Sequence, residues 1–311
     1  MAESTNIEWA DASWNPWMGC DPVSPGCKYC YAKQFWKRLG LKPGEVRRAK
    51  DATFNAPLHW KEPKRIIVGS ITDFFHEAAD KWRKEALEIM ARCQRHTFII
   101  PTKRPERIIE CLYGSNYWMP NWWFLASVEN QEMADKRIPE LLKLRKYGDW
   151  PVLGLSVEPM LGLMNLRLGG CGWCDDCKDY PGGCEDPMFK TSSGKTPIDW
   201  VVCGGESGPN ARPCHPDWVR SLRDQCIEAG VPFYFKQWGE YILKSQKPEG
   251  AKTKSFGVLS PDGTWFEGHT GWNGRDIDPD TGEAYLVEVG KKAAGRLLDG
   301  RVWDQMPEVK R

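Results

Sequence analysis

Short apolar runs alternate with amphipathic segments along most of this chain, and this alternation restricts the possible folds more than any other feature. Six runs are brief, continuous and apolar, as strands buried in a parallel sheet are. The segment before Cys20 brings the number of expected strands to about seven. The six runs are residues 65–73, 97–103, 122–129, 151–158, 200–206 and 231–236.

Helices are expected between these runs, at residues 80–92, 105–112, 139–144 and 216–230. Three of the four segments begin with proline, which suits the first turn of a helix, and the last ends on Gly230, a common helix stop. Strands that alternate with helices predict an α/β protein with a parallel sheet, open or closed into a barrel.

Length and composition set wider limits. The chain has 311 residues, enough for one large barrel or two ordinary domains. We expect a βα-barrel over residues 1–240 with a cysteine-rich insertion at 168–195, and an extension of short strands and a helix over 241–311. No apolar run of about 20 residues is present and the N-terminus lacks a secretory pattern, so a cytoplasmic protein without a membrane span is expected.

The net charge of +1 gives no overall attraction to nucleic acid, although local basic patches and some of the 17 tryptophans could still contact bases and phosphates. The 12 cysteines, in a reducing compartment, favour metal binding or simple burial over disulfides.

Polar residues stand at the C-terminal ends of the six apolar runs. In a βα-barrel these ends meet at one mouth, where sites are built, although ordinary strand ends and ion pairs would also carry polar residues. The residues at these ends are Asp73, Lys103, Glu129, Glu158, Glu206 and Lys236.

Two groups of cysteines are candidate metal ligands. Cys20, Cys27 and Cys30 form a C-x6-C-x2-C run, and three thiolates can hold a four-iron cluster while leaving its fourth iron open to a small molecule. A zinc site and structural thiols are the alternatives. The second group could hold zinc or an auxiliary iron–sulfur cluster, and it comprises Cys171, Cys174, Cys177 and Cys184.

The stretch Cys27-Lys-Tyr-Cys30 resembles the second half of the C-x3-C-x-aromatic-C loop of radical S-adenosylmethionine enzymes, although the first gap here has six residues. Residues 14–20, 24–32, 204–209, 235–239 and 291–300 resemble a phage-type family of this three-cysteine kind, similar in plan to spore photoproduct lyase and DNA repair lyases. The resemblance implies a partial (β/α)6–7 TIM-like barrel with a [4Fe-4S] cluster on Cys20, Cys27 and Cys30.

The resemblance also implies S-adenosyl-L-methionine as the second cofactor, an electron donor such as flavodoxin or ferredoxin, and a 5′-deoxyadenosyl radical. By position, Lys103, Glu129 and Lys236 are the expected catalytic residues. The expected cofactor-binding residues are Gly69, Ser70, Asp73, Ser127, Glu158, Gly204, Gly205 and Glu206.

The sequence therefore predicts a radical S-adenosylmethionine enzyme that modifies or repairs a nucleic-acid base or nucleotide. Two alternatives remain at this stage. One is a non-catalytic, zinc-stabilised nucleic-acid-binding module, and the other is a radical enzyme with a small-molecule or peptide substrate.

Overall fold

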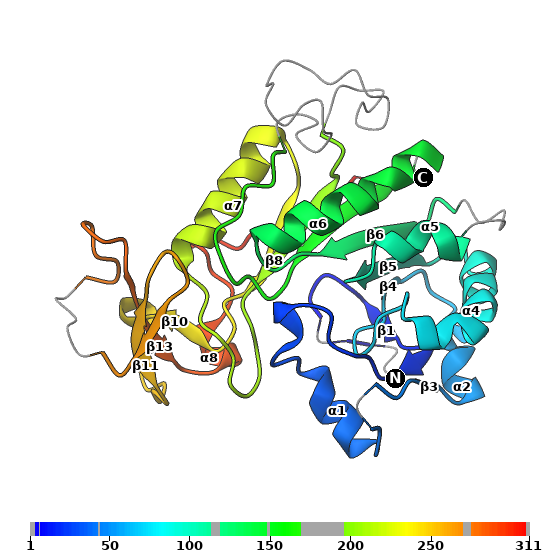
Figure 1. The fold of residues 1–311 in the computed structure, drawn as a ribbon, viewed down its shortest axis with the longest axis horizontal. Coiled ribbons are helices and arrows are strands. Elements are labelled where there is room, and N and C mark those ends of the chain that lie inside the picture. The colour runs from blue at the N-terminus through cyan, green and yellow to red at the C-terminus, as the bar shows by residue number, and fades with distance from the viewer. Residues whose placement is uncertain are drawn as a thin grey trace.

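A curled sheet of seven parallel strands forms the centre of the protein (Figure 1). The computed structural model describes residues 4–5, 7–42, 44–112, 119–147, 150–168, 196–269 and 275–308. The strand order is β1-β4-β5-β6-β7-β8-β9, so neighbours in the sheet follow one another along the chain. The strands are β1 (Ala12–Trp14), β4 (Arg65–Val68), β5 (Thr97–Thr102), β6 (Trp122–Ser127), β7 (Val152–Val157), β8 (Trp200–Gly204) and β9 (Phe233–Gln237).

The six apolar runs and the segment before Cys20 are all strands, which confirms the predicted α/β class with a parallel sheet. The sheet is a half-barrel, because β1 and β9 are its two edges and do not pair with each other. A complete TIM-like barrel is thus not formed by the described strands, and the predicted relation to the radical S-adenosylmethionine fold stays a prediction.

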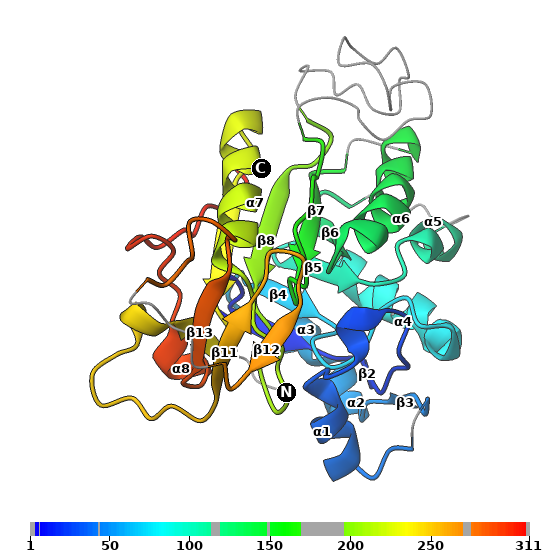
Figure 2. The ribbon, with the colours of Figure 1, turned by 60° about the vertical axis from the view of Figure 1, so that its left-hand side comes forward.

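The helices that follow β4, β5, β6 and β8 pack on the outer face of the sheet (Figures 1 and 2). The three helices expected at 80–92, 105–112 and 216–230 are present within one residue of those bounds. The helices are α1 (Ala32–Arg38), α2 (Asp51–Phe54), α3 (Ala56–His59), α4 (Asp80–Arg92), α5 (Glu106–Leu112), α6 (Gln131–Leu142), α7 (Pro216–Ala229) and α8 (Lys291–Ala294). Short 3-10 helices lie at η1 (Pro25–Cys27), η2 (Glu77–Ala79), η3 (Lys143–Tyr147) and η5 (Lys244–Gln246).

The helix expected to start at Pro139 begins eight residues earlier, so that prediction was wrong. The start signal is Asn130, whose side-chain oxygen accepts a hydrogen bond of 3.0 Å from the Met133 backbone N–H. An asparagine at this position satisfies one of the free donors of the first turn. Pro139 lies inside α6.

Successive side chains on each strand point to opposite faces of the sheet, so an apolar layer forms on each face. Ile66, Val68 and Phe98 belong to the outer layer, which contains the helix side chains such as Leu87 and Ile138. The inner layer contains Ile67 and Ile99 from the same strands. Because none of the described helices contributes a side chain to this inner layer, its side chains are available to form the floor of a site.

Three tryptophans dominate this inner layer. Trp9, from the segment before β1, makes an edge-to-face contact with Trp200 at 5.7 Å between ring centroids. Trp123 contacts the same Trp200 ring at 6.0 Å. All three side chains are buried, and together they form a rigid aromatic layer on the concave side of the sheet.

The C-terminal part of the chain adds a small antiparallel sheet in the order β10-β13-β11-β12. Its strands are β10 (Tyr241–Leu243), β11 (Phe256–Leu259), β12 (Trp265–Glu267) and β13 (Ala284–Glu288), and a further two-stranded sheet joins β2 (Trp17–Met18) to β3 (Arg47–Arg48). The main hydrophobic core includes Phe235 of the half-barrel and Leu286 of this sheet. The domain boundary expected at residue 240 stays a prediction.

The last described residues cover the free edge of β9. The Phe235 backbone N–H donates to the Trp303 carbonyl at 2.9 Å, and the Gln305 N–H donates to the Phe233 carbonyl at 3.2 Å. A covered edge cannot recruit a strand from another molecule.

Within the described residues, no helix combines the length and the apolar character that a membrane span requires. Of the expected cysteine-rich insertion, only residue 168 is described. Cys171, Cys174, Cys177 and Cys184 therefore lie outside the described residues, and the second metal stays a prediction.

Candidate functional site

A cavity of about 210 Å³ opens at the C-terminal ends of the parallel strands. The inner layer provides its floor, through Trp9 and Ile67, and the loop that carries the first three cysteines provides one wall. The residues predicted for the site from the strand ends that line this cavity are Gly69, Ser70, Asp73, Lys103, Ser127, Glu158, Gly205, Glu206 and Lys236.

Cys20, Cys27 and Cys30 all line the same cavity, and none of them forms a disulfide. The three thiols lie on one continuous loop between β2 and α1, with Cys27 at the end of the 3-10 helix η1. Three free thiols that face one cavity fit the ligand set of a cluster with one open iron, since each iron of a cubane takes a single thiolate.

Burial determines the protonation of two of these thiols, Cys20 and Cys30. Burial and, to a smaller extent, the nearby Asp73 carboxylate raise the pKa of the Cys20 thiol, the Arg104 guanidinium opposes them, and the resulting pKa is about 11. Burial also raises the pKa of Cys30. These thiols are thus protonated at neutral pH, and a metal that binds them must displace the protons.

Glu129 supports the cysteine loop from behind. Its carboxylate accepts the Gly26 N–H at 3.0 Å and pairs with Arg137 at 2.9 Å. A side chain at position 26 would lie 3.0 Å from the Glu129 carboxyl group, so a larger residue there would press on this carboxyl group. Glu129 is fully buried and does not line the cavity. The catalytic role expected for Glu129 stays a prediction. Its position in the structure is that of a residue that supports the cysteine loop.

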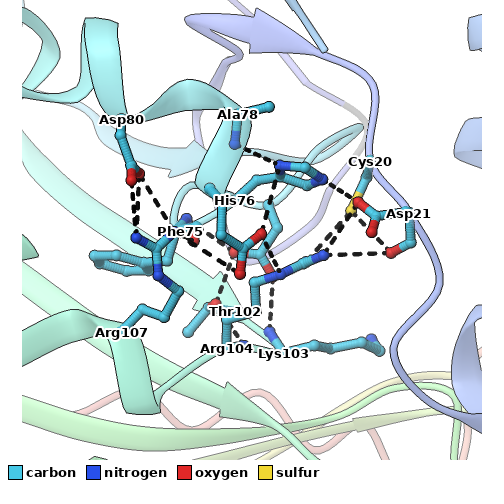
Figure 3. Close-up of polar contacts among 12 residues, drawn as sticks. Cys20, Asp21, Phe75, His76, Ala78, Asp80, Thr102, Lys103, Arg104 and Arg107 are labelled. Atoms are coloured by element: carbon cyan, nitrogen blue, oxygen red, sulfur yellow. Dashed lines mark hydrogen bonds and ion pairs between the residues drawn. The ribbon is translucent and has the colours of Figure 1, made fainter. Parts of the chain in front are cut away.

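Arg104 is a buried cation beside the first cysteine (Figure 3). Its guanidinium donates to the Cys20 Sγ at 3.6 Å and to the Asp21 carboxylate at 3.3 Å. Asp73 lies 3.5 Å from the same guanidinium. A buried positive charge at this distance stabilises negative charge on Cys20 and on anything that the thiolate binds.

Asp73 joins the ends of β4 and β5. Its two carboxylate oxygens accept hydrogen bonds from Thr102 Oγ1 at 2.7 Å, from the Phe75 N–H at 2.9 Å and from the Lys103 N–H at 2.9 Å. These contacts use most of the hydrogen-bonding capacity of the carboxylate. Asp73 therefore positions Arg104 and the strand ends.

Cys20, Asp21 and His76 form a compact group whose ligand atoms all lie within 4.8 Å of one another. His76 is buried, and its Nε2 contacts the Asp21 carboxylate, while its Nδ1 accepts the Ala78 N–H at 3.1 Å (Figure 3). A thiolate, a carboxylate and an imidazole are suitable ligands for one metal ion such as zinc. The sequence pattern gave no sign of Asp21 as a ligand beyond its place next to Cys20.

Lys103 supplies a positive charge to the cavity. Lys103 and Cys30 line the same cavity, and the charge of the Lys103 ammonium group lowers the pKa of Cys30, although burial raises this pKa overall. Within the described part of the chain, no carboxylate lies within 4.0 Å of the Lys103 ammonium group. The predicted site cation is therefore free to bind an anionic group of a ligand.

The other predicted charges are paired. Lys236 contacts Glu158 at 3.0 Å, with both side chains on the cavity wall. Gly204 lies next to this pair, since a side chain there would come within 2.7 Å of Glu158, but it does not line the cavity. Glu206 is held by Arg212, which donates to its two oxygens from the side chain at 2.7 and 2.8 Å.

Arg212 also connects the cavity wall to the cysteine loop. It donates to the Pro25 carbonyl at 3.2 Å, and its guanidinium lies over the Tyr29 ring at 5.3 Å from the centroid. Tyr29, Arg212 and Trp265 line a second cavity, of about 670 Å³, which reaches the C-terminal sheet. The spacing of Glu206 and Arg212 carried no signal in the sequence, because a loop and not a helix joins them.

These features define a class: an α/β protein with a parallel half-barrel and a cysteine-lined cavity at the C-terminal ends of its strands. The chain belongs to the family DUF5131, described as a protein of unknown function, and the match covers residues 4–307. No curated protein and no solved structure matches the chain. The family match names no activity, so the predicted similarity to radical S-adenosylmethionine enzymes and to DNA repair lyases stays a prediction.

Proposed function

We propose that this protein is a radical S-adenosylmethionine enzyme that binds a [4Fe-4S] cluster through Cys20, Cys27 and Cys30. One observation carries the proposal: three thiols without disulfides, on one loop, line the cavity at which the strand ends converge. When bound, the cluster and S-adenosylmethionine would supply radical chemistry that begins with the transfer of one electron. The electron would come from a donor such as flavodoxin or ferredoxin.

The residues of the chain would bind, orient and exclude water. Arg104 would stabilise the negative charge of a cluster bound to Cys20, since it already donates to that sulfur. Lys103 would bind the carboxylate of S-adenosylmethionine or a phosphate of the substrate. Gly69, with a φ of +80°, makes a turn at the end of β4 that a side chain would strain, and it presents backbone to the cavity.

The proposed substrate is a nucleic-acid base or nucleotide. The cavity walls carry aromatic rings, including Tyr29 and Trp36, together with the positive charge of Lys103. A base in a duplex would have to leave its stack to reach such a cavity. A small molecule or a peptide remains the alternative substrate class.

Metal analysis tests the cluster. Protein purified without oxygen should contain iron and sulfide, and Cys27→Ala should lose the iron held by this loop together with cleavage of S-adenosylmethionine. Cys111→Ala is the matched control, since Cys111 lies in α5 away from the cavity lining. Equal iron content and activity in the two variants would contradict the proposal.

A second candidate function has its own observation. The group of Cys20, Asp21 and His76 favours a single metal ion, as in a zinc-stabilised binding module without catalysis. The two candidate functions require different residues for metal binding. His76→Ala should release the metal if one ion is bound, and Cys27→Ala should release it if a cluster is bound. Zinc without sulfide, lost only in His76→Ala, would favour the module.

A further inference from the structure

Helix α1 is more exposed than α5, the other seven-residue helix of the described residues: four residues of α1 are exposed, against two of α5. Of the seven residues of α1 only Ala32 is buried. The helix projects from the body of the protein next to the cysteine loop, and both views show it with no element packed over its outer side (Figures 1 and 2). Trp36 anchors it through a hydrogen bond of 2.8 Å from its indole N–H to the Ile71 carbonyl. Burial in the core of the protein thus does not explain why this segment contains large apolar residues.

Large apolar side chains form a stripe on the exposed side of α1. Tyr31, Phe35 and Leu39 follow one another at intervals of four residues, which places them on one face. Their exposed fractions are 43%, 44% and 45%. Tyr31 also lines the cavity, so the stripe starts at the mouth of the candidate site and leads away from it.

The segment that carries this stripe is strongly basic. Between Asp21 and Glu45 the sequence contains no acidic residue. Its cations are Lys28, Lys33, Lys37, Arg38 and Lys42. None of these five makes an ion pair with any described residue, whereas buried arginines elsewhere, such as Arg104 and Arg137, do. Since the whole chain has a net charge of only +1, this excess of positive charge is confined to the segment.

The cations and the rings of this segment are interleaved. The Lys28 ammonium lies 5.1 Å from the centroid of the Tyr29 ring, and the Arg38 guanidinium lies 5.9 Å from that of Phe35. Unpaired cations with exposed rings between them match a strand of nucleic acid, which offers phosphates to the charges and unstacked bases to the rings. An apolar protein partner would match the rings but not five cations.

We infer that α1 and the loop residues on both sides of it, residues 22–42 in all, bind single-stranded nucleic acid and lead it to the cavity. This inference rests on the nucleic-acid part of the proposed function and names the surface that would perform it. A single strand fits better than a duplex, because the bases must be free to stack on Tyr31 and Phe35.

Oligonucleotide binding by the full-length protein tests the inference, with gel retardation of a 20-nucleotide dT or rU strand over a range of salt concentrations. The triple variant Lys37→Gln, Arg38→Gln, Lys42→Gln should lower the slope of log affinity against log salt by about 2, at about 0.7 for each phosphate contact with a single strand. The matched control is Lys61→Gln, Lys84→Gln, Arg92→Gln, which removes the same charge from exposed positions elsewhere and should leave the slope unchanged.

Phe35→Ala separates stacking from charge. It should weaken binding about tenfold without a change in the salt slope, since a stacked base contributes affinity that salt does not screen. Comparison of the affinities for the dT and rU strands shows whether residues 22–42 distinguish deoxyribose from ribose. Absence of binding, or equal loss in the triple variant and its control, overturns the inference. Retention of an acidic electron-transfer protein or of anionic vesicles in place of the oligonucleotides overturns it as well.

Iron content, measured on the same samples, keeps the two proposals apart. A protein that contains the cluster but binds no oligonucleotide contradicts only the inference on α1. A protein that binds oligonucleotides through α1 but contains no iron contradicts only the proposed cluster.

Discussion

Buried charges at single positions hold the wall of the candidate site in place. Arg104 contacts a thiol and three carboxylates, and Glu129 contacts the backbone of the cysteine loop. Each of these side chains is nearly or fully buried, so its interactions are little screened by water. Substitutions at these positions should therefore have large and separable effects.

Arg104→Gln should make the reduction potential of the proposed cluster more negative without loss of iron. The reduced cluster carries one more negative charge, and the variant removes a buried cation and a donor to the Cys20 sulfur. A redox titration followed by electron paramagnetic resonance measures the potential. Arg107→Gln is the control, because Arg107 pairs with Asp80 at 3.0 Å and does not line the cavity. The same potential in both variants would contradict the role of Arg104.

Glu129→Gln should destabilise the protein by about 3–5 kcal/mol, because it leaves the Arg137 guanidinium buried without its countercharge. The double variant Glu129→Gln, Arg137→Met removes that charge and should recover part of the loss. Urea denaturation followed by circular dichroism measures the free energy of unfolding. A double variant that is no more stable than Glu129→Gln would show that the ion pair is not the cause.

At the scale of elements, the sequence predicted what depends on local pattern. Continuous apolar runs identified the strands of the half-barrel, and proline and glycine identified both ends of α7. The start of α6 was missed because its signal, Asn130, directly follows the apolar run at 122–129, and Pro139 suggested a false start. Gathering of the strand-end residues into one cavity followed from the parallel topology. The partners Arg137 and Arg212 could not be predicted, because tertiary packing and loop conformation bring them to their carboxylates.

The N-terminus of α7 gives a prediction for pH dependence. His215 is fully buried, its Nδ1 accepts the Asp217 N–H at 3.1 Å, and its Nε2 donates to the Gly282 carbonyl at 2.9 Å. Burial lowers the pKa of His215 from its ordinary value of 6.5, against the smaller upward effect of the Gly282 carbonyl. The folded state therefore requires the neutral imidazole, and its stabilising contribution is complete above pH 6.5 and is lost as the pH falls through the lowered pKa.

The free energy of unfolding should thus decrease as the pH falls below about 6.5. His215→Asn keeps an acceptor for the helix N-terminus but does not titrate, so its stability should fall less over the same range. Burial also lowers the pKa of His96. Because His96 is present in the unmodified protein and in the His215→Asn variant, it adds the same pH dependence to the free energy of unfolding of both. Denaturation curves at several pH values measure the difference, and parallel pH profiles for the two proteins would refute it.

At the scale of the whole molecule, the two ends of the described chain complete the half-barrel. The segment with Trp9 fills the concave face, and the segment with Trp303 pairs with the free edge of β9. Neither role was visible in the sequence, because both segments lack a regular periodic pattern and depend on surfaces formed by distant strands.

Trp303→Ala should cost about 3–5 kcal/mol of stability and promote self-association. The indole packs on Phe233 at 6.1 Å and keeps the final segment on β9, so its loss frees an edge that can pair with other chains. Urea denaturation and light scattering measure the two effects. Val302→Ala, at an exposed neighbouring position, should change stability by less than about 0.5 kcal/mol. Equal stability of the two variants would exclude this function of the segment.

The aromatic layer on the concave face has a practical consequence. Trp9 belongs to this layer and lines the cavity, and Trp36 of α1 lines the same cavity. A coloured prosthetic group bound there would lie within range of energy transfer from both indoles, so intrinsic emission should dim as the site fills. The protein thus has built-in optical probes, and occupancy can be followed in solution without any label.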